Sequence, residues 1–208
     1  ATQKELDDLM KRNEILYVPK NVKKLNFPIM PHVKRVLWSS ANIVNDIGPS
    51  GFFSYYNLIQ ITIPKSVQII PPRAFEHCHF LTILVFESRS KLKEIGEYSF
   101  SNTKIKSVVI PSSVKIIKKG AFSNNPDLSE VSFSGEIIED EAFSRTGITS
   151  FILSNKTKSI GARAFEYCSL LTAFSINLDY SSLSEIGSYA FSESSITSIN
   201  IPPNVKTI

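Results

Sequence analysis

The sequence has few residues of the kinds that usually carry chemistry. Its 208 residues include two cysteines, three histidines and one tryptophan. No run of ~18 apolar residues occurs, so we expect no membrane segment in this chain. The first ten residues, ATQKELDDLM, also lack the apolar core of a signal peptide.

Sequence motifs of catalysis are missing as well. There is no nucleophile elbow, no glycine-rich phosphate loop and no H-E-x-x-H motif. His77, Cys78 and His79 are consecutive, which is too close to wrap one metal ion and gives a poor geometry for a nucleophile and its base. The acidic run Glu139–Glu141 is expected to be a solvated turn rather than a cation site. We therefore expect no enzymatic activity, no metal and no cofactor.

The positive charge is concentrated at one end of the chain. The net charge is +4, and residues 1–38 hold eight Lys/Arg against four Asp/Glu, whereas the remaining residues carry fifteen of each. A nucleic-acid-binding surface is normally basic throughout. We therefore expect no nucleic-acid partner.

What the sequence does contain is a repeat. The hexapeptides IGEYSF, IGARAF and IGSYAF begin at residues 95, 160 and 186. Their final Phe marks a position that recurs every 21 to 26 residues. The seven copies are Phe52, Phe75, Phe100, Phe122, Phe143, Phe165 and Phe191. An Ile stands five residues before each of them, and three further apolar positions follow in phase, so each copy is one structural unit.

A period in the low twenties is in the range of leucine-rich repeats. The segment L-x-x-(I/V/F)-x-(I/F) has the alternation of a short strand, which Pro64, Pro111 and Pro202 would end before a second extended piece, SVKxI. We predict a leucine-rich-repeat solenoid of β-rich α/β class, wound as a right-handed coil. Its concave face would be a parallel sheet, with short second strands and turns elsewhere and a short N-terminal helix.

The residues that recur in each unit can be explained by their expected place in the structure. The Phe side chains are predicted to stack through the core, with the small residue before each Phe leaving room for the neighbouring coil. The Gly that follows the Ile in four copies is expected to mark a tight bend of the backbone.

The sequence divides into three parts. Residues 1–17 are predicted to be an N-terminal helical cap, since Thr2 and Glu5 fit a capping box; the alternative is a partner-binding amphipathic helix. Residues 18–46 are expected to hold degenerate leading repeats. Residues 47–208 hold about seven copies, the last one truncated, which predicts that the chain is part of a longer protein.

The unit I-G-x-x-A-F-x-x-C/x-x-x-L-x-x-I-x-I-P-x-S-V-K-x-I resembles the BspA-like, or Treponema-type, leucine-rich repeat over about residues 43–208. It lacks the Asn column of the commoner leucine-rich repeats and uses Ile and Phe in place of Leu. The family's members are surface proteins of bacteria and of parasitic or mucosal protists, implicated in adhesion to host matrix proteins and in cell–cell contact. The resemblance implies a non-enzymatic protein–protein interaction module, a fragment of a cell-surface or secreted adhesion protein. Its ligand would be an extracellular matrix or cell-surface protein.

The repeat supports a second function equally well. An intracellular structural or scaffold protein, cytoplasmic or cytoskeletal, could hold partner proteins on the same solenoid surface. The lack of a signal peptide and of disulfides favours this alternative, and the family resemblance favours the adhesion protein.

The two cysteines occupy equivalent positions. Cys78 and Cys168 each lie three residues after a repeat Phe, four coils apart. At ~4.8 Å per coil their backbones would be roughly 19 Å apart, whereas a disulfide needs Cα atoms within ~7 Å. We expect both to be small buried fillers of the turn. An N-glycosylation triplet at Asn155 falls just after a strand, and the sequence leaves its use open.

Candidate partner-binding residues come from the outward positions of the predicted sheet and from its loops. Most outward positions are small and polar, but Ile83, Val85, Val109 and Ile152 would form an apolar patch. The alternative is that β-branched residues simply suit strands.

The loop candidates belong to two insertions and one turn. They are Arg89 and Lys91 in ESRSK, Tyr180 in NLDYS, and Tyr55 and Tyr56 after Phe52. Insertions on one edge of a solenoid often make contacts with partners. We expect the two tyrosines of the turn to be exposed.

Overall fold

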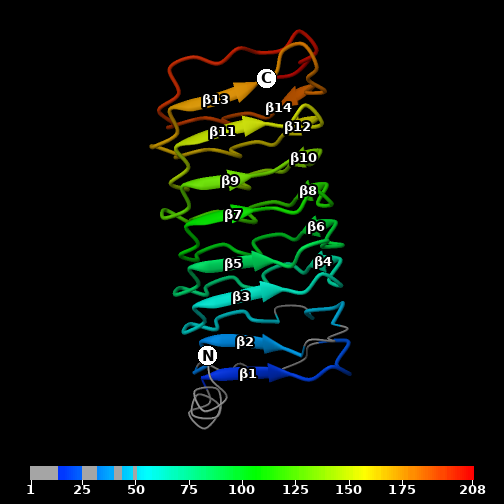
Figure 1. Ribbon diagram of the computed structural model, residues 1–208. Coiled ribbons are helices and arrows are strands. Elements are labelled where there is room, and N and C mark those ends of the chain that lie inside the picture. The colour runs from blue at the N-terminus through cyan, green and yellow to red at the C-terminus, as the bar shows by residue number, and fades with distance from the viewer. Residues whose placement is uncertain (1–13, 25–31, 40–43, 49–50) are drawn as a thin grey trace.

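The computed structural model describes residues 14–24, 32–39, 44–48 and 51–208. Over these residues the chain is a parallel β-solenoid of about seven turns, with one coil stacked on the next (Figure 1). No helix occurs among the described residues, so the predicted α/β class is wrong there and the fold is all-β. The handedness and the concavity of the sheet remain predictions.

The longer strands of successive coils lie side by side on one face, which we call the long-strand sheet; their hydrogen bonds join them in three groups, of four, two and two strands. Its strands are β1 (Ile15–Val18), β2 (Arg35–Trp38), β3 (Gln60–Ile63), β5 (Ile83–Phe86), β7 (Ser107–Val109), β9 (Glu130–Ser132), β11 (Ser150–Leu153) and β13 (Ala173–Ile176). All pairs are parallel, and equivalent repeat positions lie side by side, as Ser107 does with Glu130 and Ser150 with Ala173. This confirms the predicted parallel sheet and its phase.

The second extended pieces form a separate short-strand sheet. Its strands are β4 (Ile69–Ile70), β6 (Glu94–Ile95), β8 (Ile116–Ile117), β10 (Ile137–Ile138), β12 (Ser159–Ile160) and β14 (Glu185–Ile186). Each of these six strands ends on the buried Ile that opens the IGxxAF element. The chain therefore alternates between the two sheets once per coil (Figure 1).

The repeat Phe residues form a continuous ladder between the sheets, as predicted. Successive ring centroids are 5.0 to 5.6 Å apart, and the rings are tilted by only 3° to 20°. Every member from Phe52 to Phe165 is fully buried. Burial of a large aromatic side chain in each coil contributes hydrophobic stabilisation that joins one coil to the next.

The turns around each Phe are joined by backbone hydrogen bonds. The Phe122 N–H donates to the Ala142 carbonyl at 2.9 Å, and the Phe165 N–H donates to the Ala190 carbonyl at 2.7 Å. Among the described residues, those two before and two after each repeat Phe have φ between 52° and 62°, although all but Gly120 are non-glycine. Such residues are uncommon. They persist here because their own N–H groups also donate to the next coil, as Arg145 does to Glu166.

The glycines after the Ile serve a different purpose from the predicted tight bend. Among them only Gly48 has a positive φ, 77°. At Gly161 an added Cβ would lie 2.4 Å from the Asp140 nitrogen, and at Gly187 it would lie 2.3 Å from the Ala162 nitrogen. These positions need glycine because the backbone of the preceding coil approaches closely.

The predicted helical cap covers residues 1–17, of which 1–13 lie outside the described residues. Residues 15–17 belong to β1, so the helix prediction is wrong for them and the first strand begins three residues before the predicted boundary. β1 pairs in register with β2, which in turn pairs with β3. The other predicted boundaries remain predictions.

Candidate functional site

The outward positions of the long-strand sheet form an exposed column that crosses several coils. Val109 is 76% exposed and Ile152 is 77% exposed, while Ile83 and Val85 are about half exposed. The register places Val109 beside Ser132. The expected exposure of the four apolar candidates is confirmed, and their role in binding remains a proposal.

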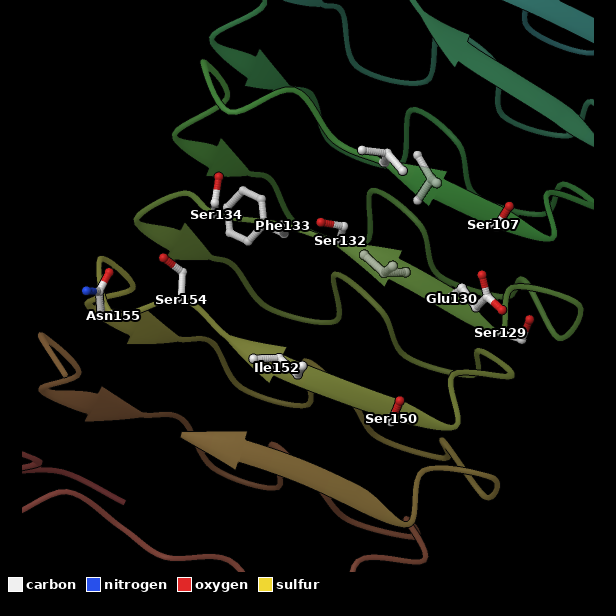
Figure 2. A pocket seen from close by; sticks show the side chains of 13 residues that line it. Ser107, Ser129, Glu130, Ser132, Phe133, Ser134, Ser150, Ile152, Ser154 and Asn155 are labelled. Atoms are coloured by element: carbon white, nitrogen blue, oxygen red, sulfur yellow. The ribbon is translucent and has the colours of Figure 1, made fainter. Parts of the chain in front are cut away.

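Two neighbouring hollows lie on this sheet. The larger, of about 680 Å³, crosses β7, β9 and β11, and the smaller, of about 440 Å³, lies between β5, β7 and the loop after β5. Both are lined by Ser107 and Val109. In the larger hollow Ile152 stands among serine side chains, with Glu130 at one end and Asn155 near the other (Figure 2). The arrangement is an apolar centre within a hydroxyl-rich frame.

Of the candidates in the two insertions, only Arg89 lines one of these hollows. Arg89 is exposed and lines the smaller hollow, with a left-handed φ of 58°, and Lys91 is exposed two residues further on. Tyr180 is 74% exposed but lines neither hollow.

The turn after Phe52 gives one correct prediction and one wrong one. Tyr56 is about half exposed and stacks on His79 with ring centroids 5.9 Å apart, away from the hollows. Tyr55 was expected to be exposed but is buried, with its ring edge-on to Phe52 at 5.2 Å. From Phe52 to Phe165 the residue three positions after each repeat Phe is buried, and Tyr55 occupies that position.

Sequence reasoning missed what this position does in the later coils. Its side chains carry hydrogen-bond donors that satisfy carbonyl groups of the repeat Phe residues. The Cys78 Sγ donates to the Phe52 carbonyl, and the Thr146 Oγ1 and the Cys168 Sγ both donate to the Phe143 carbonyl. Cys, Thr and Asn recur at this phase in the sequence, and that shared chemistry was the available signal.

The predicted role of the cysteines as buried fillers is confirmed. Both thiols are free and fully buried. Burial raises the pKa of Cys78 to about 12, and burial also raises the pKa of Cys168. The Cys78 thiol is therefore protonated and turned into the core, which is the opposite of what an attacking nucleophile requires.

We expect neither thiol to react with an alkylating or disulfide reagent at pH 8 while the chain is folded. Both should react rapidly in urea. Because the folded pKa of Cys78 exceeds the ordinary value of 9.0, stability should fall as pH rises from 9 towards 12, where only the unfolded thiol ionises. Rapid labelling of Cys78 in the native chain would contradict this arrangement.

The described part of the chain offers neither a metal site nor a membrane-spanning helix. In that part no group of three or more His, Cys, Asp or Glu side chains could hold a metal ion. The described residues also include no helix that is long and apolar enough to cross a bilayer.

Solved structures share this fold. A leucine-rich repeat protein from Bacteroides ovatus is 24% identical, with a TM-score of 0.64, over 92% of this chain and 52% of that one. The pneumococcal vaccine antigen PcpA is 22% identical, with a TM-score of 0.65, over 94% and 52%. A leucine-rich cell surface protein from Faecalibacterium prausnitzii is 19% identical, with a TM-score of 0.50, over 93% and 68%. The chain spans about half the length of the first two, and the likeness shows the fold alone.

Comparison with sequence families is more specific. No curated protein is significantly similar to the chain. The model of the BspA-type leucine-rich repeat region matches six copies over residues 45–172 and 136–208, which is most of the chain. The chain therefore belongs to the BspA-type leucine-rich repeat family.

Proposed function

We propose that the chain is a non-enzymatic protein-binding module of a cell-surface adhesion or host-contact protein. It contacts its partner through the apolar centre of the long-strand sheet. The observation that carries the proposal is the exposure of Val109 and Ile152, about three quarters each, over one hollow.

These side chains stand out because the surrounding positions are polar. Ser107, Ser132 and Ser150 occupy neighbouring outward positions and are exposed. Protein interfaces commonly place a few apolar residues at a dry centre within a rim of polar groups. Burial of a Val or Ile side chain contributes about 1.5–3 kcal/mol, so two such residues can supply much of the affinity for a partner.

Support for a place at the cell surface comes from the family and from its solved neighbours. One neighbour is named as a vaccine antigen and another as a cell surface protein. The partner we propose is a protein of the extracellular matrix or of another cell's surface.

The location can be tested on intact source cells with an antibody to residues 43–208. Labelling without permeabilisation, lost after mild external protease, is the expected result. Labelling that requires permeabilisation would overturn the adhesion proposal and favour an intracellular scaffold.

The binding face can be tested with the double variant Val109→Ser/Ile152→Ser, which keeps the net charge and uses the residue already common on this face. We expect binding of the purified chain to immobilised matrix proteins or to host cells to weaken at least tenfold. The matched control is Ile69→Ser/Leu178→Ser, at exposed apolar residues that line neither hollow. Equal losses in the two variants would mean that the long-strand sheet is not the binding face.

A further inference from the structure

One edge of the solenoid gathers basic side chains that are scattered in the sequence. We call it the basic edge, and it consists of the segments that lead from the long-strand sheet to the short-strand sheet in five successive coils. These segments are residues 64–69, 87–94, 111–116, 134–137 and 154–159. They hold seven cations and three carboxylates, namely Lys65, Arg89, Lys91, Lys93, Lys115, Lys156 and Lys158 against Glu87, Glu94 and Glu136.

This concentration is not a property of the whole surface. Residues 39–208 carry fifteen charges of each sign, so outside the basic edge eight cations face twelve carboxylates. The coil therefore separates the charges of a neutral body into a positive edge and a negative remainder. Such separation gives the edge a local potential that attracts anions despite the balanced total.

Several of these cations are not neutralised locally. Glu136 pairs with Lys115 at 3.5 Å and with Lys158 at 2.7 Å. Glu87 accepts the backbone N–H of Lys65 at 2.9 Å. Within the described residues, no carboxylate lies within ion-pair distance of the cationic groups of the remaining exposed members. These are Arg89, Lys91, Lys93 and Lys156.

The smaller hollow adds a binding geometry to this charge. It lies beside the insertion after β5 and is lined by Arg89, by the serines at positions 88, 90, 112 and 113, and by Glu87, whose carboxylate accepts the Lys65 N–H. The Ser113 hydroxyl donates to the Ser90 carbonyl, which ties the insertion to the following coil. A guanidinium beside several hydroxyl donors suits a sulfate or carboxylate group.

We propose that the basic edge binds a linear anionic polysaccharide along the solenoid axis, with one of its sulfate or carboxylate groups in the hollow at Arg89. Successive coils are ~4.8 Å apart, so an extended polyanion meets a new segment of the edge at each step. The serine hydroxyls and the Asn155 amide are suitable partners for sugar hydroxyls.

The same edge suits nucleic acid poorly. Proteins that bind single strands combine a basic groove with aromatic side chains on which bases stack. None of the five segments of the basic edge contains an aromatic residue. This inference goes beyond the proposed protein-binding function, because it concerns a different ligand and an edge that meets the proposed protein-binding face only at the smaller hollow.

The test uses heparin as the probe, with the full chain at about 0.15 M salt. We expect measurable binding that weakens as salt increases, and no binding to desulfated heparin or to neutral dextran. The variant Arg89→Gln/Lys91→Gln/Lys93→Gln should lose at least tenfold in affinity. The control Lys104→Gln/Lys106→Gln/Lys119→Gln removes the same charge elsewhere and should change affinity less than twofold. Circular dichroism and thermal unfolding would verify that both variants fold.

Each other outcome overturns the proposal. Equal losses in the two variants would indicate a general charge effect, and the absence of heparin binding would exclude the site. Tighter binding of poly-glutamate would identify an acidic protein segment as the ligand, and tighter binding of duplex DNA would identify nucleic acid. The variant Ile152→Ser, at a residue that lines only the larger hollow, should leave heparin affinity unchanged, so failure of one proposal can be distinguished from failure of the other.

Discussion

Replacement of Phe122 by Ala is expected to lower the free energy of unfolding by about 3–5 kcal/mol. Phe122 is fully buried at the middle of the ladder, with the ring of Phe100 at 5.3 Å and the ring of Phe143 at 5.6 Å. Its removal leaves a cavity between two coils and breaks two stacked contacts at once. Because each coil of a solenoid is stabilised only by its neighbours, the loss falls on the interface that joins the two halves.

Urea unfolding followed by circular dichroism would measure this loss. The control is Phe80→Ala, the same substitution at a side chain that is 59% exposed. We expect it to change stability by no more than about 0.5 kcal/mol, as is usual for surface substitutions. Similar losses at the two positions would show that the ladder does not carry the stability of the stack.

The Phe ladder and the parallel sheet could be predicted because one periodic signal determines both. Once the Phe positions and the strand positions share a phase over seven copies, stacking places each residue beside its equivalent in the next coil. The outward positions follow from the alternation within a strand, which is why the exposure of Val109 and Ile152 was predicted correctly. The periodic pattern of apolar residues was therefore sufficient to predict burial and exposure at positions that recur in every coil.

Features that depend on one coil touching the next were missed. The sequence shows Gly161 and Gly187 but does not show how closely the backbone of the preceding coil approaches them, so it suggested only a bend. Tyr55 was expected to be exposed because it lies in the turn after Phe52, although Cys78 at the same repeat position already indicated an inward side chain. The residues with positive φ on either side of each repeat Phe could not be predicted either. Almost none of them is glycine, so the sequence carries no signal for a left-handed backbone there.

The basic edge also could not be found by reading along the chain. Its cations extend from Lys65 to Lys158, and neighbouring ones are separated by up to 41 residues in the sequence. Only the stacking of coils brings Lys93 near Lys115, whose backbone N–H donates to the Lys93 carbonyl at 2.9 Å. A surface of a solenoid is formed by equivalent positions of successive repeats, so the composition of a single repeat does not reveal it.

Replacement of Asn125 by Ala is the second large effect, with an expected loss of about 4 kcal/mol. Asn125 is fully buried at the position three residues after Phe122. Its Nδ2 donates to the carbonyls of Phe100 and Phe122, each at 2.8 Å, and its Oδ1 accepts the N–H and the hydroxyl of Thr103 at 2.7 and 2.8 Å. Alanine would leave these groups buried with fewer partners, and each unsatisfied group costs about 1–3 kcal/mol.

A second variant, Asn125→Thr, separates the hydrogen bonds from the loss of volume. Threonine occupies this position in a neighbouring coil, where the Thr146 hydroxyl donates to the Phe143 carbonyl at 2.8 Å. It should satisfy the Phe122 carbonyl but not reach Thr103, so we expect roughly half the loss seen with alanine. Urea unfolding of both variants would measure the difference. If threonine were as damaging as alanine, the residues three positions after each repeat Phe would not stabilise the fold through hydrogen bonds to the Phe carbonyls. The recurrence of Cys, Thr and Asn at this phase would then need another cause.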